Sequence, residues 1–178
     1  GTEKFIKKDA FYPLRNLGVS NPVIDATLFA GMFSIGTLFI RCVGDIKRHG
    51  IDYSSLDIDK RRNFVIEAAR LYPTVTTTHR IVESDEEVKV SGKTIKLTAG
   101  DEVIYPFACA NTDTTEFKCP HKMDVERPKE EYDKVLSWSS GPHACPAKDL
   151  SILITMVMLD TLLEKESLES LDYKGALL

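Results

Sequence analysis

The sequence has little excess charge, few cysteines and no long apolar run, and each shortage excludes a class of protein. Lys and Arg number 23 and Asp and Glu number 27, so the formal net charge is −4. No surplus of cations is therefore available to neutralise nucleic-acid phosphates. The composition, with 43% hydrophobic and 28% charged residues, is that of an ordinary globular domain. We predict a folded chain without a nucleic-acid partner.

The four cysteines are too sparse for a disulfide scaffold, and no two of them have the Cys-x-x-Cys spacing of a zinc site. Cys109, Cys119 and His121 are an alternative metal site, although their spacing matches no recognised zinc pattern. Reduced thiols are typical of an intracellular protein. The sequence therefore favours thiols over disulfides.

No segment of the sequence has the pattern of a membrane anchor or a signal peptide. Residues 1–16 are charged and lack the apolar core of a signal peptide. The longest uncharged stretch, 26–40, is shorter than the roughly 20 apolar residues that a membrane-spanning helix needs. We expect no transmembrane span and an intracellular location, either cytoplasmic or peripherally membrane-associated.

The clearest predicted element is a long helix over residues 22–49. Asn21 can cap it, Pro22 suits its first position, and Gly50 suits the position just past its end. Its middle is apolar on every face, which predicts a helix that is buried all round.

The remaining pattern predicts a mainly α protein with small β-sheets, of the α+β class. A helix is expected over 55–72, with its start near Ser55 to Asp59, followed by a strand within 74–82 and a hairpin turning at Ser91-Gly92. Residues 103–110 suit a strand or a short helix. Residues 111–140 suit a long loop, and 148–163 have helical periodicity.

Three charged residues are candidates for one buried cluster. Glu67 and Arg70 lie three apart on a predicted helix and so share a face. Arg127 completes a Glu–Arg–Arg cluster if the long loop folds back onto that helix. The alternative is that each of the three charges is merely solvated.

The segment Trp138–Leu150 contains the strongest chemical signal. A single cysteine, Cys145, ends a loop rich in Gly and Pro and directly precedes a helix. The partial positive charge of a helix N-terminus favours a thiolate over a thiol, and a thiolate with apolar surroundings suits ligation of haem iron. The alternative is a buried structural cysteine.

The motifs together resemble the cytochrome P450 family. Three of the family's motifs occur here in the family's order: a Glu-x-x-Arg helix, a loop that ends in a second Arg, and the haem-binding loop. Arg80 and His143 stand at positions that usually meet the haem propionates in that family. The matching positions are Glu67, Arg70, Arg80, Arg127, Trp138, Gly141, His143, Cys145 and Ala147.

This resemblance implies the C-terminal, haem-binding half of the family's fold, with the N-terminal half absent. Residues 1–178 then form a partial haem-thiolate domain that binds haem b, with the loop 138–147 supplying the axial ligand Cys145 and the proximal helix over 148–163. Glu67, Arg70 and Arg127 form the structural triad, and the helix over 22–49 crosses the distal face of the haem. We expect a missing N-terminal segment or a second chain to complete the domain.

The predicted distal helix departs from the family's usual monooxygenase pattern. Phe33 stands where an acid normally delivers protons, and Ser34 replaces the usual Thr. This helix, together with Trp-Ser-x-Gly-Pro at 138–142 and Cys-x-x-Lys-Asp at 145–149, resembles the fatty-acid hydroperoxide-metabolising branch. That branch comprises allene oxide synthases, hydroperoxide lyases and epoxyalcohol synthases.

The resemblance to this branch predicts an enzyme that rearranges or dehydrates a lipid hydroperoxide without O₂ or NADPH. The substrate already contains the O–O bond to be cleaved, and Ser34 is the expected distal hydrogen-bonding group. Two alternatives stay open. One is a conventional monooxygenase that uses Thr37 or Ser34 with water, and the other is a non-catalytic haem-binding fragment completed by another chain.

Overall fold

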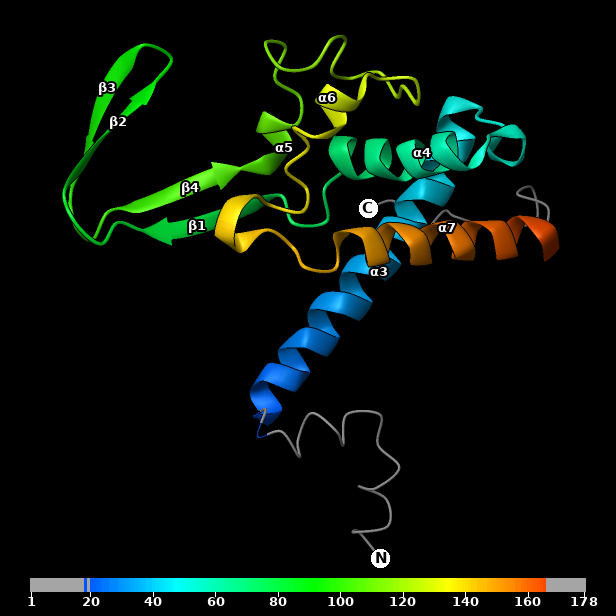
Figure 1. Ribbon diagram of the computed structural model, residues 1–178, viewed down its shortest axis with the longest axis horizontal. Helices are drawn as coiled ribbons and strands as arrows, with labels where there is room; N and C mark the ends of the chain where they lie inside the picture. The colour runs from blue at the N-terminus through cyan, green and yellow to red at the C-terminus, as the bar shows by residue number, and fades with distance from the viewer. Residues whose placement is uncertain (1–17, 19, 166–178) are drawn as a thin grey trace, which may run out of the picture.

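The computed structural model describes residues 18 and 20–165 as a helical body with two small antiparallel sheets on one side (Figure 1). This is the mainly α architecture with small sheets that the sequence predicts. The elements of the helical body are α3 (Asn21–His49), η1 (Tyr53–Ser55), α4 (Ile58–Leu71), α5 (Phe107–Ala110), α6 (Lys129–Tyr132), η2 (Gly141–His143) and α7 (Lys148–Lys165). The strands are β1 (Thr77–Ile81), β2 (Glu86–Val90), β3 (Lys93–Leu97) and β4 (Glu102–Pro106).

The core lies where α3, α4 and α7 pack against one another. The C-terminal half of α3 contributes Leu38, Cys42, Val43 and Ile46, all of them buried, and Phe64 of α4 is fully buried opposite them. Gly50 ends α3 with a positive φ of 60°, and its N–H bonds to the carbonyls of Ile46 and Lys47. The long helix therefore ends at His49, as the sequence predicts.

The prediction that α3 is buried all round is wrong for the described part of the chain. Met32 is 74% exposed and Phe33 is 57% exposed. The N-terminal half of α3 projects away from the rest of the described chain (Figure 1). An apolar helix is buried only where other parts of the protein pack against it. Along α3, the buried core begins at Leu38 and includes none of the described residues before it. Among the described residues, no helix is both long enough and apolar enough to cross a membrane.

The second helix starts within the segment that the sequence predicts, residues 55–59. Residues Tyr53–Ser55 form the 3₁₀ turn η1 that precedes it. The helix α4 begins at Ile58 because the carboxylate of Asp57 accepts a hydrogen bond from the N–H of Lys60 at 2.8 Å. Several Ser and Asp residues in this segment are possible caps, and Asp57 is the one that is used.

The two sheets have two strands each. β1 pairs with β4, and β2 pairs with β3, both antiparallel. Ser91 and Gly92 join β2 to β3 with positive φ angles of 49° and 77°, as a two-residue turn between twisted strands requires. The predicted hairpin is confirmed, and residues 102–110 adopt both of the predicted forms, first β4 and then the short helix α5.

The buried carboxyl group of Asp45 on α3 predicts a pH dependence of stability. Its side chain is fully buried, it pairs with Arg48, and its Oδ2 has no hydrogen-bond partner. Burial raises the pKa of Asp45 from 3.8 to about 6. The folded state therefore holds a proton between pH 4 and 6 that the unfolded state has released, so stability falls as the pH rises through this window.

We expect Asp45→Asn to remove this loss of stability. Relative to the variant, the wild type should lose up to about 3 kcal/mol of unfolding free energy between pH 4 and pH 7. Urea unfolding at several pH values measures the difference, and Asp52→Asn, which removes an exposed carboxyl group, is the control. Parallel curves for the wild type and Asp45→Asn would contradict the prediction.

Candidate functional site

A buried ion-pair cluster joins α4 to the long loop that follows α5. The Nε of Arg70 lies 2.6 Å from Oε1 of Glu67, and both side chains are fully buried. The Nε of Arg127 lies 3.0 Å from Oε2 of the same carboxylate, with its side chain only 3% exposed. One carboxylate therefore faces two guanidinium groups, and the structure brings together all three residues of the predicted cluster.

The remaining N–H groups of the two arginines hold the loop. Arg70 donates to the carbonyls of Asn111, Pro120 and Lys122 at 2.6–3.2 Å. Arg127 donates to the carbonyls of Lys118, Cys119 and Lys122 at 2.6–3.1 Å. Burial lowers the pKa of Arg127, but its bonds to Glu67 and Glu131 outweigh this effect and raise the pKa overall. The cluster thus shapes a segment that has little regular secondary structure.

Asn111 attaches the far end of the same loop to α4. This fully buried side chain donates to Oγ of Ser137 at 2.9 Å and accepts from the N–H of Leu136 at 2.8 Å. The hydroxyl of Ser137 in turn donates to the carbonyl of Ala69 at 2.6 Å. Sequence reasoning gave Asn111 no such role, because its partners are distant in the chain and no local pattern marks them.

Cys145 lies at the end of the loop that leads into α7. Its thiol is reduced and half-buried, and it packs against the apolar core. The N–H of Cys145 donates to the carbonyl of Trp138 at 2.8 Å. Ser139 and Gly141 have positive φ angles of 60° and 62°, which fold the chain tightly enough for this bond to form. The cysteine is thus held by a compact loop next to the apolar interior.

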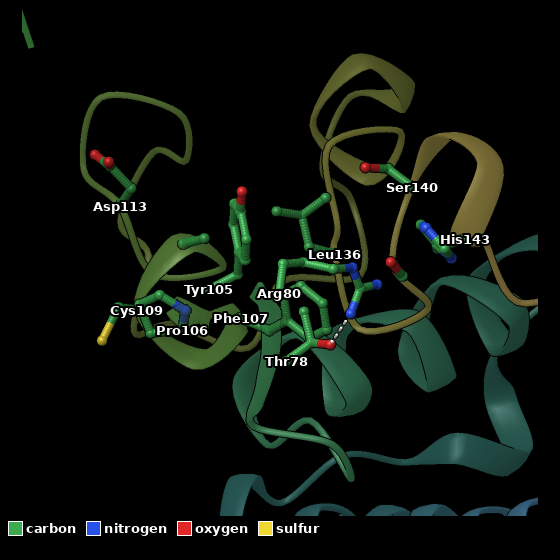
Figure 2. A pocket seen from close by; sticks show the side chains of 12 residues that line it. Thr78, Arg80, Tyr105, Pro106, Phe107, Cys109, Asp113, Leu136, Ser140 and His143 are labelled. Atoms are coloured by element: carbon green, nitrogen blue, oxygen red, sulfur yellow. Dashed lines mark hydrogen bonds between the residues drawn. The ribbon is translucent and has the colours of Figure 1, made fainter. Parts of the chain in front are cut away.

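A pocket of about 470 Å³ lies between the β1–β4 ribbon and the cysteine loop. Figure 2 shows the guanidinium of Arg80 on the side of the pocket where Ser140 and His143 lie. Arg80 bonds to Oγ1 of Thr78 at 2.9 Å and to the carbonyl of His79 at 2.7 Å. No carboxylate of the described residues forms an ion pair with it, and Asp113, which also lines the pocket, is not bonded to it.

The structure does not bring every candidate residue to this pocket. Neither Ser34, which is half-buried on α3, nor Cys145 is among the residues that line it. Cys109 lines the pocket, whereas Cys119 and His121 do not. The alternative metal site is not formed, because no group of three or more His, Cys, Asp or Glu residues in the described chain is placed to hold a metal ion.

Comparison with known proteins gives consistent matches. A model of the family "Cytochrome P450" matches residues 61–174. Cytochrome P450(BM-1) of Priestia megaterium is 34% identical over 85 residues, which make up 48% of this chain and 19% of that protein. A bifunctional dioxygenase–epoxy alcohol synthase of Fusarium oxysporum is 36% identical over 81 residues, which make up 46% of this chain and 6% of that protein.

A solved structure shares the fold. The crystal structure of CYP109E1 from Bacillus megaterium in complex with corticosterone matches with a TM-score of 0.68 at 24% identity. The match covers 78% of this chain and 36% of that one.

The fold and the matched segment define the class as haem-dependent proteins. More specifically, the chain belongs to the cytochrome P450 family. The matched region spans about a fifth of the length of cytochrome P450(BM-1) and about a third of the CYP109E1 chain. Membership of the family implies a haem cofactor.

The described residues fit a haem on physical grounds. A haem carries two carboxylates on a flat apolar body, and the pocket combines the unpaired cation Arg80 with the apolar side chains of Phe107 and Leu136. A guanidinium suits recognition of a carboxylate because its planar donors match the two oxygens. His143, on the same side of the pocket as the guanidinium, adds a second polar group (Figure 2).

The cluster on α4 predicts a large effect of a small substitution. Glu67→Gln leaves Arg70 buried without an anion and leaves Arg127 with Glu131 as its remaining carboxylate partner, and we expect it to reduce the unfolding free energy by about 3–5 kcal/mol. Denaturant unfolding measures this change. The matched control is Glu126→Gln, which breaks an exposed pair with Lys60 and should change stability only slightly, because solvent screens that pair. Equal effects of the two substitutions would contradict the prediction.

Proposed function

We propose that this chain is the haem-binding part of a haem-thiolate enzyme that rearranges or dehydrates a fatty-acid hydroperoxide. In this proposal haem b is the cofactor and Cys145 is the axial ligand of the iron. Arg80 and His143 bind the propionates, and Glu67, Arg70 and Arg127 hold the fold around the site. Neither O₂ nor NADPH is consumed, since the substrate brings the oxidising equivalents.

The observation that carries the proposal is the absence of any carboxylate in the sequence of α3 between Asp25 and Asp45. Activation of O₂ needs protons delivered to the bound oxygen, and Phe33 occupies the position at which the family usually has an acid. A phenyl ring cannot relay a proton. A substrate that already contains an O–O bond avoids this requirement.

The roles of the residues follow from their chemistry. A thiolate-ligated haem, when bound, supplies the one-electron chemistry that breaks the O–O bond of a hydroperoxide. Ser34, half-buried on α3, has a hydroxyl group that can hydrogen-bond to the hydroperoxide oxygen and orient it. Phe33, beside it, keeps charge out of this part of the helix. The relative from Fusarium oxysporum supports the proposal, because its name includes an epoxy alcohol synthase activity.

The ligand assignment is tested by the absorption spectrum of the ferrous protein with carbon monoxide. The haem-loaded chain should show the strongly red-shifted Soret band that reports thiolate ligation, and Cys145→Ser should abolish it. Cys109→Ser removes an exposed thiol and should leave the band in place. A red-shifted band that survives Cys145→Ser would contradict the assignment.

The reaction is tested with purified haem-loaded chain, linoleate hydroperoxide and no reductant. We expect the hydroperoxide to be consumed and Ser34→Ala to slow the reaction by roughly 10²-fold, the effect of losing one transition-state hydrogen bond. Thr37→Ala, a hydroxyl deletion on the same helix, is the matched control. No turnover in the wild type, combined with NADPH consumption when a reductase is added, would favour the monooxygenase alternative. Retention of haem without either reaction would favour a non-catalytic haem-binding fragment.

A further inference from the structure

We propose that Ser151 and Lys148, in the first turn of α7, are positioning residues for the haem ligand. They hold the indole of Trp138, and through it the backbone on either side of Cys145. This inference rests on the proposed role of Cys145 and adds two residues to which the motifs assign no structural part.

A closed ring of hydrogen bonds joins Trp138, Ser151, Lys148 and Cys145. The indole Nε1–H of Trp138 donates to Oγ of Ser151 at 3.0 Å, and that hydroxyl donates to the carbonyl of Lys148 at 2.7 Å. The N–H of Lys148 donates to the carbonyl of Cys145 at 3.4 Å, and the N–H of Cys145 donates to the carbonyl of Trp138 at 2.8 Å. Both backbone polar groups of Cys145 therefore belong to the ring, which we call the Trp138 ring.

The side chains of the Trp138 ring are placed so that water competes little with these bonds. Trp138 is 9% exposed and Ser151 is 8% exposed. The ammonium group of Lys148 lies 5.6 Å from the centroid of the indole, within the range of a cation–π interaction. The indole is thus held at its edge by a hydroxyl and over its face by a charge, both from the same turn of α7.

The consequence for Cys145 follows from geometry. The direction of a Cα–Cβ bond is fixed by the backbone of its own residue, and the backbone of Cys145 is held on both sides by the Trp138 ring. The loop before it contains the short turn η2 and two left-handed residues. Regular secondary structure therefore does little to fix the direction of the sulfur. The hydrogen bonds of the Trp138 ring fix it instead. A ligand must be held close to one geometry to bind a metal well.

The experiment uses the fact that Trp138 is the only tryptophan in the sequence. Its indole proton gives one resolved NMR signal, and its hydrogen exchange can be followed in the haem-free chain. The haem-loaded chain then gives the fraction of the ferrous carbon monoxide complex in the red-shifted thiolate form. The first readout reports the anchor and the second reports the ligand.

We expect Ser151→Ala to accelerate exchange of the indole proton by roughly tenfold, the effect of losing one buried hydrogen bond, and to lower the thiolate fraction. Ser151→Thr keeps a hydroxyl and should preserve both values. Thr161→Ala deletes a hydroxyl that bonds within α7 far along the helix and is the matched control. Lys148→Met, which changes a half-buried side chain, should change both readouts in the same direction as Ser151→Ala. This second variant tests the inference if Ser151→Ala does not fold.

The outcomes separate this inference from the proposed reaction. If the Ser151 and Lys148 variants match Thr161→Ala in both readouts, the inference is wrong. If exchange accelerates but the thiolate fraction stays constant, the indole contributes stability alone and the inference is also wrong. A wild type without a thiolate band overturns the ligand assignment and this inference together. If the expected changes occur in a protein that does not consume hydroperoxide, only the proposed reaction fails.

Discussion

The carboxylate of Glu67 is the group on which the arrangement of the site depends. Two guanidinium groups, those of Arg70 and Arg127, lie beside it in the interior, and buried charges of this kind are tolerated only when they are paired and hydrogen-bonded. Their other N–H groups bond to loop carbonyls, and Arg70 also lies 5.2 Å from the centroid of the Phe117 ring. A loop with little helix or strand thus acquires a defined path from charge rather than from a backbone ladder. The same loop continues to Trp138, at which the cysteine loop begins.

Local signals in the sequence were sufficient to predict those elements whose ends or turns depend on one or two residues. The end of α3 at Gly50 and the hairpin turn at Ser91-Gly92 each depend on a backbone conformation that one or two residues decide. The start of α4 could be predicted only to within residues 55–59, because several neighbouring residues can cap a helix and only the tertiary structure selects Asp57. The burial of α3 was overestimated for a related reason: a pattern of apolar residues does not show which surface covers them.

The candidate site was predictable only where a family pattern supplied long-range information. Glu67 and Arg70 share a helix face by spacing alone, but nothing in the composition of the chain brings Arg127 to them. The same holds for Arg80 and His143, which come from a strand and from the cysteine loop and face one pocket. The parts that sequence reasoning missed, the bonds of Asn111 and those of Ser151, join ordinary polar residues whose partners become neighbours only in the folded chain.

The β2–β3 hairpin offers a practical point of attachment. It stands apart from the helical body (Figure 1), its residues are almost all exposed, and its turn at Ser91-Gly92 touches neither the pocket nor the ion-pair cluster. Exposed tips of this kind accept insertions well. A fluorophore, an affinity tag or a surface linker placed there would report on the protein or immobilise it while leaving the cysteine loop unchanged.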